Sequence, residues 1–450
     1  MRSRRFQGPA VSLVSAAVAL TILIGGCSRG CGGGFTGDAR RPNVILIIVD
    51  TLRADAVRPG DDDAVMPYLS GLATRSVYFS QARSPSSWTL PTMGSLFLAR
   101  YPSEHLMGKR GWKDVLPRSG TTLAEAVADH GYHTAALVSH PLLGQGRVGR
   151  GFDDFRSMDR STPEVTKAAL AWLDANADDK APFFLYVHYI DPHNPYLAID
   201  GFTAPRADDS GRPDFALAMN PGAGILKDTD EERREFWNYT ESEQERLRQL
   251  YDGEARHVDH HLARLFAGLE ERGLLGRSIV IVTSDHGEEF GEHGIFGHGA
   301  SLFEAAVRVP LIISLPDSTR ALVSSPVNTG GLGPGLLEEL DIPAPDSFRI
   351  SAFSIRAAKP PGEFVYLDLP LSDELKLHAH RSGVVSAGGT LLVSDNGEET
   401  FSSPNAEADV ARLRSIHALM RSRTEPGEQS GAVEYDAQLL DQLRALGYAE

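Results

Sequence analysis

The stretch Asn43–Leu52, NVILIIVDTL, decides the fold of this chain. Its apolar residues 44–49 are all β-branched or aliphatic, a composition typical of a strand buried on both faces in a parallel α/β sheet. The run ends abruptly in Asp50. Because open α/β sheets bind their ligands outside the carboxyl ends of the strands, Asp50 is predicted to serve chemistry and not packing.

A second strand of the same design lies far downstream, at Ser278–Ser284, SIVIVTS. It is followed at once by Asp285 and His286. Two strands that deliver carboxylate and imidazole ligands to one sheet edge predict a divalent-metal site formed by Asp50, Asp285 and His286. The alternative is that Asp-His-Gly only punctuates a turn, since Asp and Gly are common turn residues.

The loop Ser84–Ser95, SPSSWTLPTMGS, is rich in hydroxyl side chains. Pro91 is predicted to open a helix that runs through Met93 to Leu98, because proline is favoured in the first turn. The unpaired N–H groups at a helix N-terminus favour an anionic substrate. Thr89 is therefore the predicted nucleophile.

A third apolar strand, Phe183–Ile190, ends in the sequence DPHNPY. The logic that applies to Asp50 predicts Asp191 and His193 at the same edge of the sheet. Alternatively, the two prolines of this sequence only form a rigid turn. His188, inside the strand, is predicted to be a core histidine with satisfied hydrogen bonds.

Further polar residues follow these strands. The glycine-rich loop after Asp285 carries His298, which can donate to a non-bridging oxygen or protonate a leaving group. Arg53 follows Asp50 closely and is predicted to help hold an anionic group, with a solvated loop arginine as the alternative. His257, His260 and His261 lie on a predicted helix over 240–272 without an H-E-x-x-H pairing, so they are predicted to be non-catalytic.

Composition restricts the function. The 450 residues are 42% hydrophobic and 23% charged, as in globular proteins, and the formal net charge is −16. Such an acidic chain is not expected to bind nucleic acid, which requires a basic face. Cys27 and Cys31 are the two cysteines, so a metal in the folded domain must be held by oxygen and imidazole ligands.

The N-terminal residues predict the cellular compartment of the protein. Basic MRSRR precedes an apolar run over 11–26 that is shorter than a membrane span, and small residues lead into Cys27. This pattern is similar to a bacterial lipobox. It predicts a signal peptide over 1–26, a flexible glycine-rich linker over 27–41, and a protein of the cell envelope anchored through lipidated Cys27, facing the periplasm or exterior. An uncleaved membrane anchor is the alternative.

The remaining pattern alternates strands and helices. Helices are predicted over 67–76, 121–130 and 163–177, and strands over 77–79, 134–139 and 307–314. This rhythm predicts a doubly wound α/β domain. A segment rich in Asp, Pro and Gly over 201–239 is read as an excursion that shapes the substrate pocket, and 383–395 as a β-hairpin.

The motifs VDTLRAD, SPSSWTLPTMGSL, YPSEH, DPHNPY, TSDHGEEFGEHGIFGHG and LFEAAVRVPLII occur in this order. Their sequence resembles the sulfatase family of the alkaline phosphatase superfamily over 41–316, with a weaker echo in the C-terminal LRALGY. The resemblance implies a mixed, mostly parallel sheet flanked by helices in a catalytic domain over 42–345. It also implies a small antiparallel subdomain over 346–450.

The resemblance further assigns residues. It implies a divalent metal held by Asp50, Thr89, Asp285 and His286, with His193 contacting the reacting oxyanion. His298 stands where many sulfatases carry a catalytic lysine. Calcium, magnesium, manganese and zinc all suit these ligands, and Asp191, His193 and His298 would form the second site of a two-zinc version.

This chain departs from the family at the C/S-x-P-S/T-R motif, where Thr89 stands at the formylglycine position and Met93 replaces the arginine. A secondary alcohol cannot yield an aldehyde. The chain is therefore predicted to hydrolyse phosphate or sulfate esters through Thr89, with phosphate ranked ahead. The substrate is expected to be an anionic ester, such as an envelope glycan or a lipid headgroup. An envelope phospho-group transferase and an inactive glycan-binding protein are the alternatives.

Overall fold

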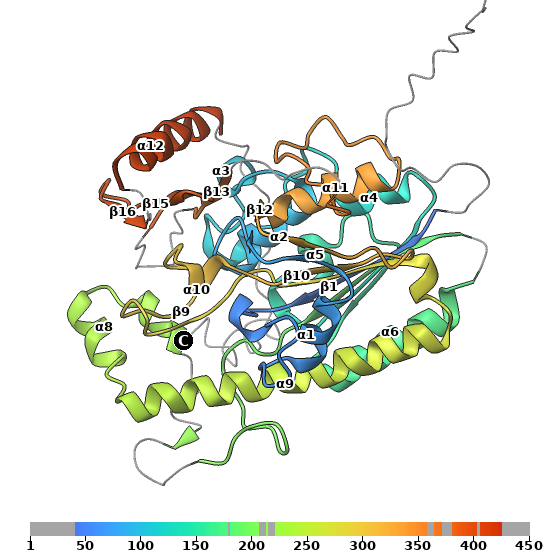
Figure 1. Cartoon of the computed structure of the whole chain (residues 1–450), viewed down its shortest axis with the longest axis horizontal. Helices are drawn as coiled ribbons and strands as arrows, with labels where there is room; N and C mark the ends of the chain where they lie inside the picture. The colour runs from blue at the N-terminus through green and yellow to red at the C-terminus, as the bar shows by residue number, and fades with distance from the viewer. Residues whose placement is uncertain are drawn as a thin grey trace, which may run out of the picture. The chain divides into compact units, whose positions relative to one another are not determined.

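The computed structural model describes residues 41–178, 181–206, 213–214, 221–357, 364–370, 380–402 and 406–424. These belong to one compact unit that spans Thr36–Glu450 (Figure 1). The predicted signal peptide and Cys27 lie outside the described residues, so lipid anchoring stays a prediction. None of the helices in the described ranges combines the length and apolar character needed to span a bilayer.

The unit is built on an eight-stranded sheet in the order β11-β2-β10-β7-β1-β6-β4-β5. Only β10 runs antiparallel to its neighbours, so the sheet is mixed and mostly parallel, as predicted. The strands are β1 (Asn43–Val49), β2 (Val77–Phe79), β4 (His133–Val138), β5 (Asp154–Ser157), β6 (Phe183–Tyr189), β7 (Ser278–Thr283), β10 (Leu311–Ser314) and β11 (Ala321–Val323).

Strand β1 lies at the centre, paired with β6 on one side and β7 on the other. Its side chains alternate between two apolar cores: Val44, Leu46 and Ile48 enter one, and Ile45, Ile47 and Val49 enter the other. The continuous apolar run is thereby explained, because both faces of the strand are buried.

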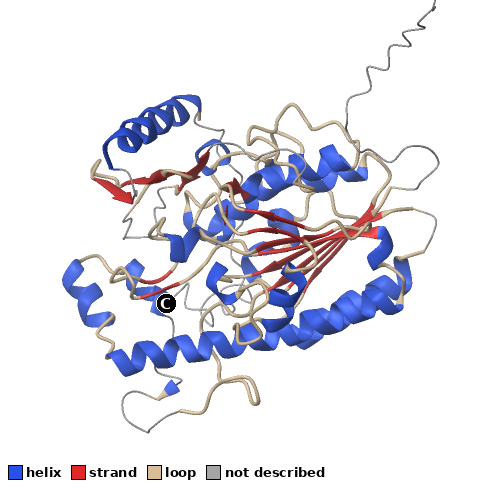
Figure 2. Ribbon diagram, viewed as in Figure 1, coloured by secondary structure: helices blue, strands red, loops and turns tan. Residues whose placement is uncertain are grey.

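Helices cover both faces (Figure 2). Helices α1, α6 and α9 pack on one face of the sheet, and α2, α4 and α11 on the other. The α-helices are α1 (Pro67–Ala73), α2 (Thr89–Leu98), α3 (Pro102–His105), α4 (Leu123–Ala128), α5 (Gln145–Val148), α6 (Thr162–Asn176), α8 (Asp230–Phe236), α9 (Glu241–Glu271), α10 (Glu304–Val307), α11 (Leu332–Glu339) and α12 (Ala406–Arg423). Short 3₁₀ helices cover Ala54–Ala56, Gly111–Lys113, Pro141–Leu143, Pro221–Leu226, Leu275–Arg277 and Thr329–Gly331.

Several predicted elements differ from the structure in their bounds; the helix predicted over 67–76, for example, ends at Ala73. The strand predicted over 307–314 begins only at Leu311, because Pro310 cannot donate to a ladder and α10 occupies the start of that segment. The helix predicted to open at Pro91 begins two residues earlier, at Thr89. Thr89 is thus the first helical residue, which places its hydroxyl at the helix N-terminus as expected.

Smaller sheets complete the unit. Strands β13 (Phe364–Asp368), β14 (Ser382–Ser386), β15 (Gly389–Val393) and β16 (Glu399–Ser402) form the predicted antiparallel sheet. Its residues Val365, Leu367 and Val385 join the core that contains α2. Two short pairs remain, β3 (Ala82–Arg83) with β12 (Val327–Asn328), and β8 (Glu289–Phe290) with β9 (Phe296–Gly297).

Candidate metal centre and nucleophile

Asp50 directly follows β1 and is fully buried. Neither of its carboxylate oxygens has a hydrogen-bond partner. Burial raises the pKa of Asp50 well above its usual value, and the nearby Asp285 carboxylate raises it further. The next residue, Thr51, has a φ of 53°, a left-handed conformation rare for a β-branched residue. The backbone is therefore strained where it presents this carboxylate.

Asp285 and His286 follow β7, the strand next to β1. Oδ1 of Asp285 accepts the backbone N–H of Thr51 at 3.2 Å and that of His286 at 3.0 Å. Its other oxygen, Oδ2, is buried without a hydrogen-bond partner and lies 3.5 Å from Nε2 of His286. The hydrogen bonds on Oδ1 thus hold the carboxylate so that Oδ2 and the imidazole nitrogen are neighbours.

The tautomer of His286 follows from its partners. Nδ1 lies 2.9 Å from the carbonyl oxygen of Gly287, which can only accept, so Nδ1 carries the hydrogen. Burial lowers the pKa of His286, which favours the neutral ring. Nε2 therefore carries a lone pair, and Thr89 Oγ1, 3.2 Å away, donates its hydroxyl hydrogen to it.

These atoms suit a divalent cation. Asp50, Asp285, His286 and Thr89 each present an oxygen or imidazole lone pair to one buried region. Two buried carboxylates with free oxygens are costly unless a positive charge compensates them. The structure thus brings together the residues that the sequence predicts as metal ligands, and the unpaired oxygens fit a hard or borderline cation.

His188 differs from its prediction. It is fully buried, as expected of a core residue, but both ring nitrogens lack a hydrogen-bond partner. Nε2 lies 3.9 Å from Oδ2 of Asp50, and ligand atoms of His188, Asp50 and Asp285 fall within 4.8 Å of one another. The prediction of a satisfied core histidine is therefore wrong: the ring faces the candidate metal centre.

His140, which the sequence reasoning missed, follows β4 as Asp50 follows β1. Its Nε2 lies 3.4 Å from Oδ2 of Asp50, and the two residues group with His193 as a possible cation site. However, Nδ1 of His140 accepts the backbone N–H of Leu142 at 3.0 Å. In the neutral ring Nε2 thus carries the hydrogen and offers no lone pair to a metal, although it forms no hydrogen bond to Asp50. The sequence signal that could have identified His140 is its position just after a predicted strand.

His193 and His298 border the centre. The ring centroid of His298 lies 4.4 Å from that of His286 and 5.0 Å from that of His193. Nδ1 of His193 lies 2.5 Å from the carbonyl oxygen of Asn194, so this nitrogen carries the hydrogen. The neutral ring of His193 presents a lone pair at Nε2, and a hydrogen bond from Nε2 to an oxyanion requires the protonated ring.

Arg53 and Asp191 are held elsewhere. The Arg53 guanidinium pairs with Asp55 at 2.7 Å and Glu292 at 2.6 Å, so two carboxylates already neutralise it. This arrangement gives no support to an anion-binding role for Arg53.

Asp191 is also engaged by other residues. Its oxygens accept hydrogen bonds from Arg160 at 2.7 Å and Thr162 at 2.6 Å. The metal-compatible groups of the described residues do not include Asp191. The predicted second site of Asp191, His193 and His298 is therefore not formed in this geometry.

A cavity of about 230 Å³ borders this region at the carboxyl ends of β4, β5 and β6. Its wall combines polar residues, among them His140, Asp159 and Arg160, with apolar side chains. The lining residues are Ser139, His140, Pro141, Ser157, Met158, Asp159, Arg160, Ile190, Pro195 and Leu197.

Comparison with known proteins agrees with this arrangement. The sequence model of the Sulfatase family matches residues 42–342, which contain the whole central sheet and every residue of the centre. The chain belongs to the sulfatase family. An ulvan-active sulfatase of Formosa agariphila is 27% identical over 341 residues, which cover 68% of this chain and 63% of that relative.

Solved structures share the sulfatase fold. A protein solved with its substrate D-glucosamine-2-N,6-O-disulfate gives a TM-score of 0.68 at 17% identity, covering 86% of this chain and 99% of that one. The phosphonate monoester hydrolase of Silicibacter pomeroyi gives 0.66 at 20% identity, covering 88% and 100%. At these identities the likeness establishes the fold alone.

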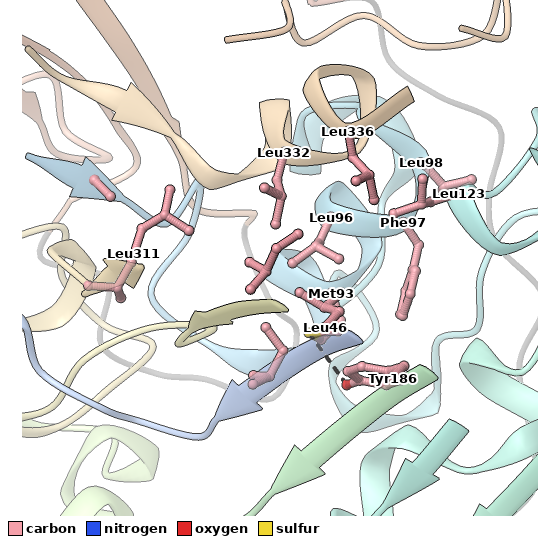
Figure 3. Close-up of a cluster of buried hydrophobic side chains, with 14 of the residues drawn as sticks. Leu46, Met93, Leu96, Phe97, Leu98, Leu123, Tyr186, Leu311, Leu332 and Leu336 are labelled. Carbon is pink, nitrogen blue, oxygen red and sulfur yellow. Dashed lines mark hydrogen bonds between the residues drawn. The ribbon is translucent and has the colours of Figure 1, made fainter. Parts of the chain in front are cut away.

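Met93 has a structural role in this family member. Thr89 begins α2, and Met93, one turn later, is fully buried in the core between the helix and the sheet (Figure 3). Its sulfur lies 4.0 Å from the hydroxyl of Tyr186 on β6. This sulfatase-family chain thus places an uncharged side chain between α2 and the sheet.

Proposed function

We propose that this chain is a metal-dependent hydrolase that cleaves phosphate or sulfate esters with Thr89 as the nucleophile. The observation that carries the proposal is the 3.2 Å contact between Thr89 Oγ1 and the lone pair of His286, beside the unpaired oxygens of Asp50 and Asp285. Family membership supports ester hydrolysis in general. The relatives act on both sulfur and phosphorus centres by name, so it does not choose between them.

A divalent cation bound by Asp50, Asp285, His286 and Thr89 would lower the pKa of the Thr89 hydroxyl and offset the negative charge of the ester. Thr89 Oγ1 then attacks the phosphorus or sulfur atom and displaces the organic alcohol, which leaves a threonyl ester. Water hydrolyses this intermediate. His298, next to His286, is the proposed donor to the leaving oxygen, and His193, next to His298, is the proposed contact of the ester oxygens.

We rank phosphate above sulfate because of the residue at the nucleophile position. Threonine is a secondary alcohol and cannot be oxidised to the formylglycine aldehyde on which family sulfatases rely. A double displacement through a threonyl ester needs no such modification, and it has more precedent at phosphorus than at sulfur. Met93 agrees with this departure, since the second residue that defines the formylglycine motif is also replaced.

Substitution of Thr89 tests the proposal. Turnover of aryl phosphate, aryl phosphodiester and aryl sulfate should fall on the order of 10³-fold or more in Thr89→Ala. Thr89→Ser should retain part of the activity, because it keeps a hydroxyl at the same place. Mass spectrometry of acid-quenched wild-type reactions should find the transferred group on the Thr89 peptide. Near-wild-type rates in Thr89→Ala would assign the attack to water, or to Ser86 or Ser87, whose buried hydroxyls also lack partners.

A further inference from the structure

Glu288 is a buried carboxylate that the proposed reaction does not yet use. Its Oε1 lies 2.8 Å from Nδ1 of His298, and its Oε2 accepts the hydroxyl of Tyr196 at 2.9 Å. Tyr196 is itself only 1% exposed. Among the described residues, no arginine or lysine side chain forms an ion pair with Glu288. One carboxylate oxygen of Glu288 therefore contacts His298, and the other accepts a hydrogen bond from Tyr196.

The local fold explains this pairing. Strands β8 and β9 form an antiparallel pair in which Glu289 lies opposite Gly297 and Phe290 opposite Phe296. Continuing this register by one residue places Glu288 opposite His298, so the two side chains are cross-strand neighbours at the open end of the hairpin. Gly297 has a φ of 89°, a conformation that glycine adopts without strain. The hairpin thus fixes both members of the pair.

The hydrogen bond determines which nitrogen of His298 can react. A carboxylate accepts hydrogen bonds, so Nδ1 of His298 carries the hydrogen that it donates to Glu288. Nε2 is left for chemistry, and the ring lies beside those of His286 and His193. A carboxylate that holds the far side of an imidazole fixes both its rotation and its tautomer.

We propose that Glu288, supported by Tyr196, is the positioning residue for His298 in ester cleavage. This inference rests on the proposed function. As Thr89 Oγ1 bonds to the phosphorus or sulfur atom, the bond from that atom to the organic oxygen breaks. His298 enters this step as the imidazolium, with a hydrogen on both ring nitrogens, and the hydroxyl proton of Thr89 passes to solvent as Oγ1 attacks. The proton on Nε2 of His298 moves to the leaving oxygen, which departs as a neutral alcohol, and His298 remains as the neutral ring with its Nδ1 hydrogen on Glu288.

The test compares leaving groups. A phenyl ester needs protonation of its leaving oxygen much more than a 4-nitrophenyl ester of the same acid. Glu288→Gln should lower kcat for the phenyl ester about 10-fold or more, and that for the 4-nitrophenyl ester less than about 3-fold, with little change in KM. His298→Ala should widen the same difference. Equal losses on both esters would overturn the proposal, because they indicate a merely structural role.

A double-mutant cycle tests whether Glu288 acts through His298. Once His298 is alanine, adding Glu288→Gln should change the rate less than about 2-fold. If the two substitutions lower the rate independently, so that their fold-losses multiply in the double variant, the proposal is overturned. Glu289→Gln is the matched control: Glu289 binds His293 at 2.9 Å on the same hairpin, but His293 is partly exposed. This variant should leave the ratio of the two rates unchanged.

A second readout does not depend on activity. In the full chain the Nδ1 proton of His298 should give a downfield proton NMR signal that is absent in His298→Ala. The signal should move upfield in Glu288→Gln, since a neutral acceptor forms a weaker hydrogen bond. An unchanged signal would overturn the assignment of Glu288. If the wild-type chain turns over neither ester, the proposed function and the proton transfer both fail, and the signal alone then decides whether Glu288 holds His298.

Discussion

At the scale of single residues, the hydrogen-bond partners of the carboxylates at the sheet edge distinguish their roles. Asp50 and Asp285 keep buried oxygens without hydrogen bonds, whereas both oxygens of Asp191 are taken by Arg160 and Thr162. All three follow strands at the same edge of the sheet. A cation gains most where an oxygen has no other partner, so the proposed metal is assigned to Asp50 and Asp285 and not to Asp191.

Metal content tests this distinction. Wild-type protein purified without chelator should contain one equivalent of divalent metal by elemental analysis, and Asp285→Asn should lose it. Asp191→Asn, a matched change at the same sheet edge, should keep its metal because Asp191 is committed to Arg160 and Thr162. Two equivalents in the wild type, with one lost in Asp191→Asn, would instead establish the binuclear version.

At the scale of the element, α2 links the proposed nucleophile to the core. The helix begins at Thr89, and its residues Met93, Leu96 and Phe97 are buried against the sheet and α11 (Figure 3). Phe97 packs edge-on against Tyr186 with ring centroids 5.4 Å apart. The position of the Thr89 hydroxyl therefore depends on apolar packing one to two turns away.

Truncation of Met93 should expose this dependence. Met93→Ala should lower the free energy of unfolding by about 2–5 kcal/mol, because it opens a cavity in a fully buried site. Met93→Leu keeps the volume and should cost less than about 1.5 kcal/mol. Leu419 on α12 is 49% exposed, and Leu419→Ala should change stability by less than about 0.5 kcal/mol. Urea unfolding measures all three, and a Met93→Ala loss no larger than that of Leu419→Ala would contradict the packing described.

At the scale of the whole molecule, the candidate metal site joins distant parts of the sequence. Asp50 and Asp285 are separated by 235 positions and come from adjacent strands, β1 and β7, while Thr89 comes from a helix on one face of the sheet. A cation bound to all three would stabilise the folded chain and not the unfolded one. Its removal leaves buried carboxylates without compensation.

Chelation should therefore lower thermal stability. Free metal at about 100 times its Kd contributes about 2.7 kcal/mol to the free energy of unfolding. Tm should fall by an amount on the order of 5 °C when a chelator is added, and should recover with excess divalent metal. Asp50→Asn/Asp285→Asn should show no response to either reagent. A wild-type Tm that is unchanged by the chelator would count against a resident metal at this centre.

The sequence by itself determined which strands are central and which residues end them. Continuous apolar runs such as 44–49 identify strands buried on both faces, and Asp50, Asp285 and His286 directly follow such runs. The doubly wound sheet was predictable for the same reason, because hydrophobic periodicity is local. The small antiparallel sheet was expected from the resemblance to the sulfatase family and from the hairpin pattern over 383–395. The expected cluster of Asp50, Asp285 and His286 needed only the rule that strand ends share one edge, and Thr89 joined it through the resemblance to the sulfatase family.

Only the tertiary structure decided how the polar side chains pair. His188 reads as a core residue because its neighbours in sequence are apolar, yet its ring meets Asp50 from the adjacent strand. Arg53 and Asp191 are neutralised by partners such as Glu292 and Arg160, which no local pattern reveals. Hydrogen bonds and ion pairs between distant segments depend on strand register and loop geometry, so the chemical state of each group was fixed only when the chain had folded.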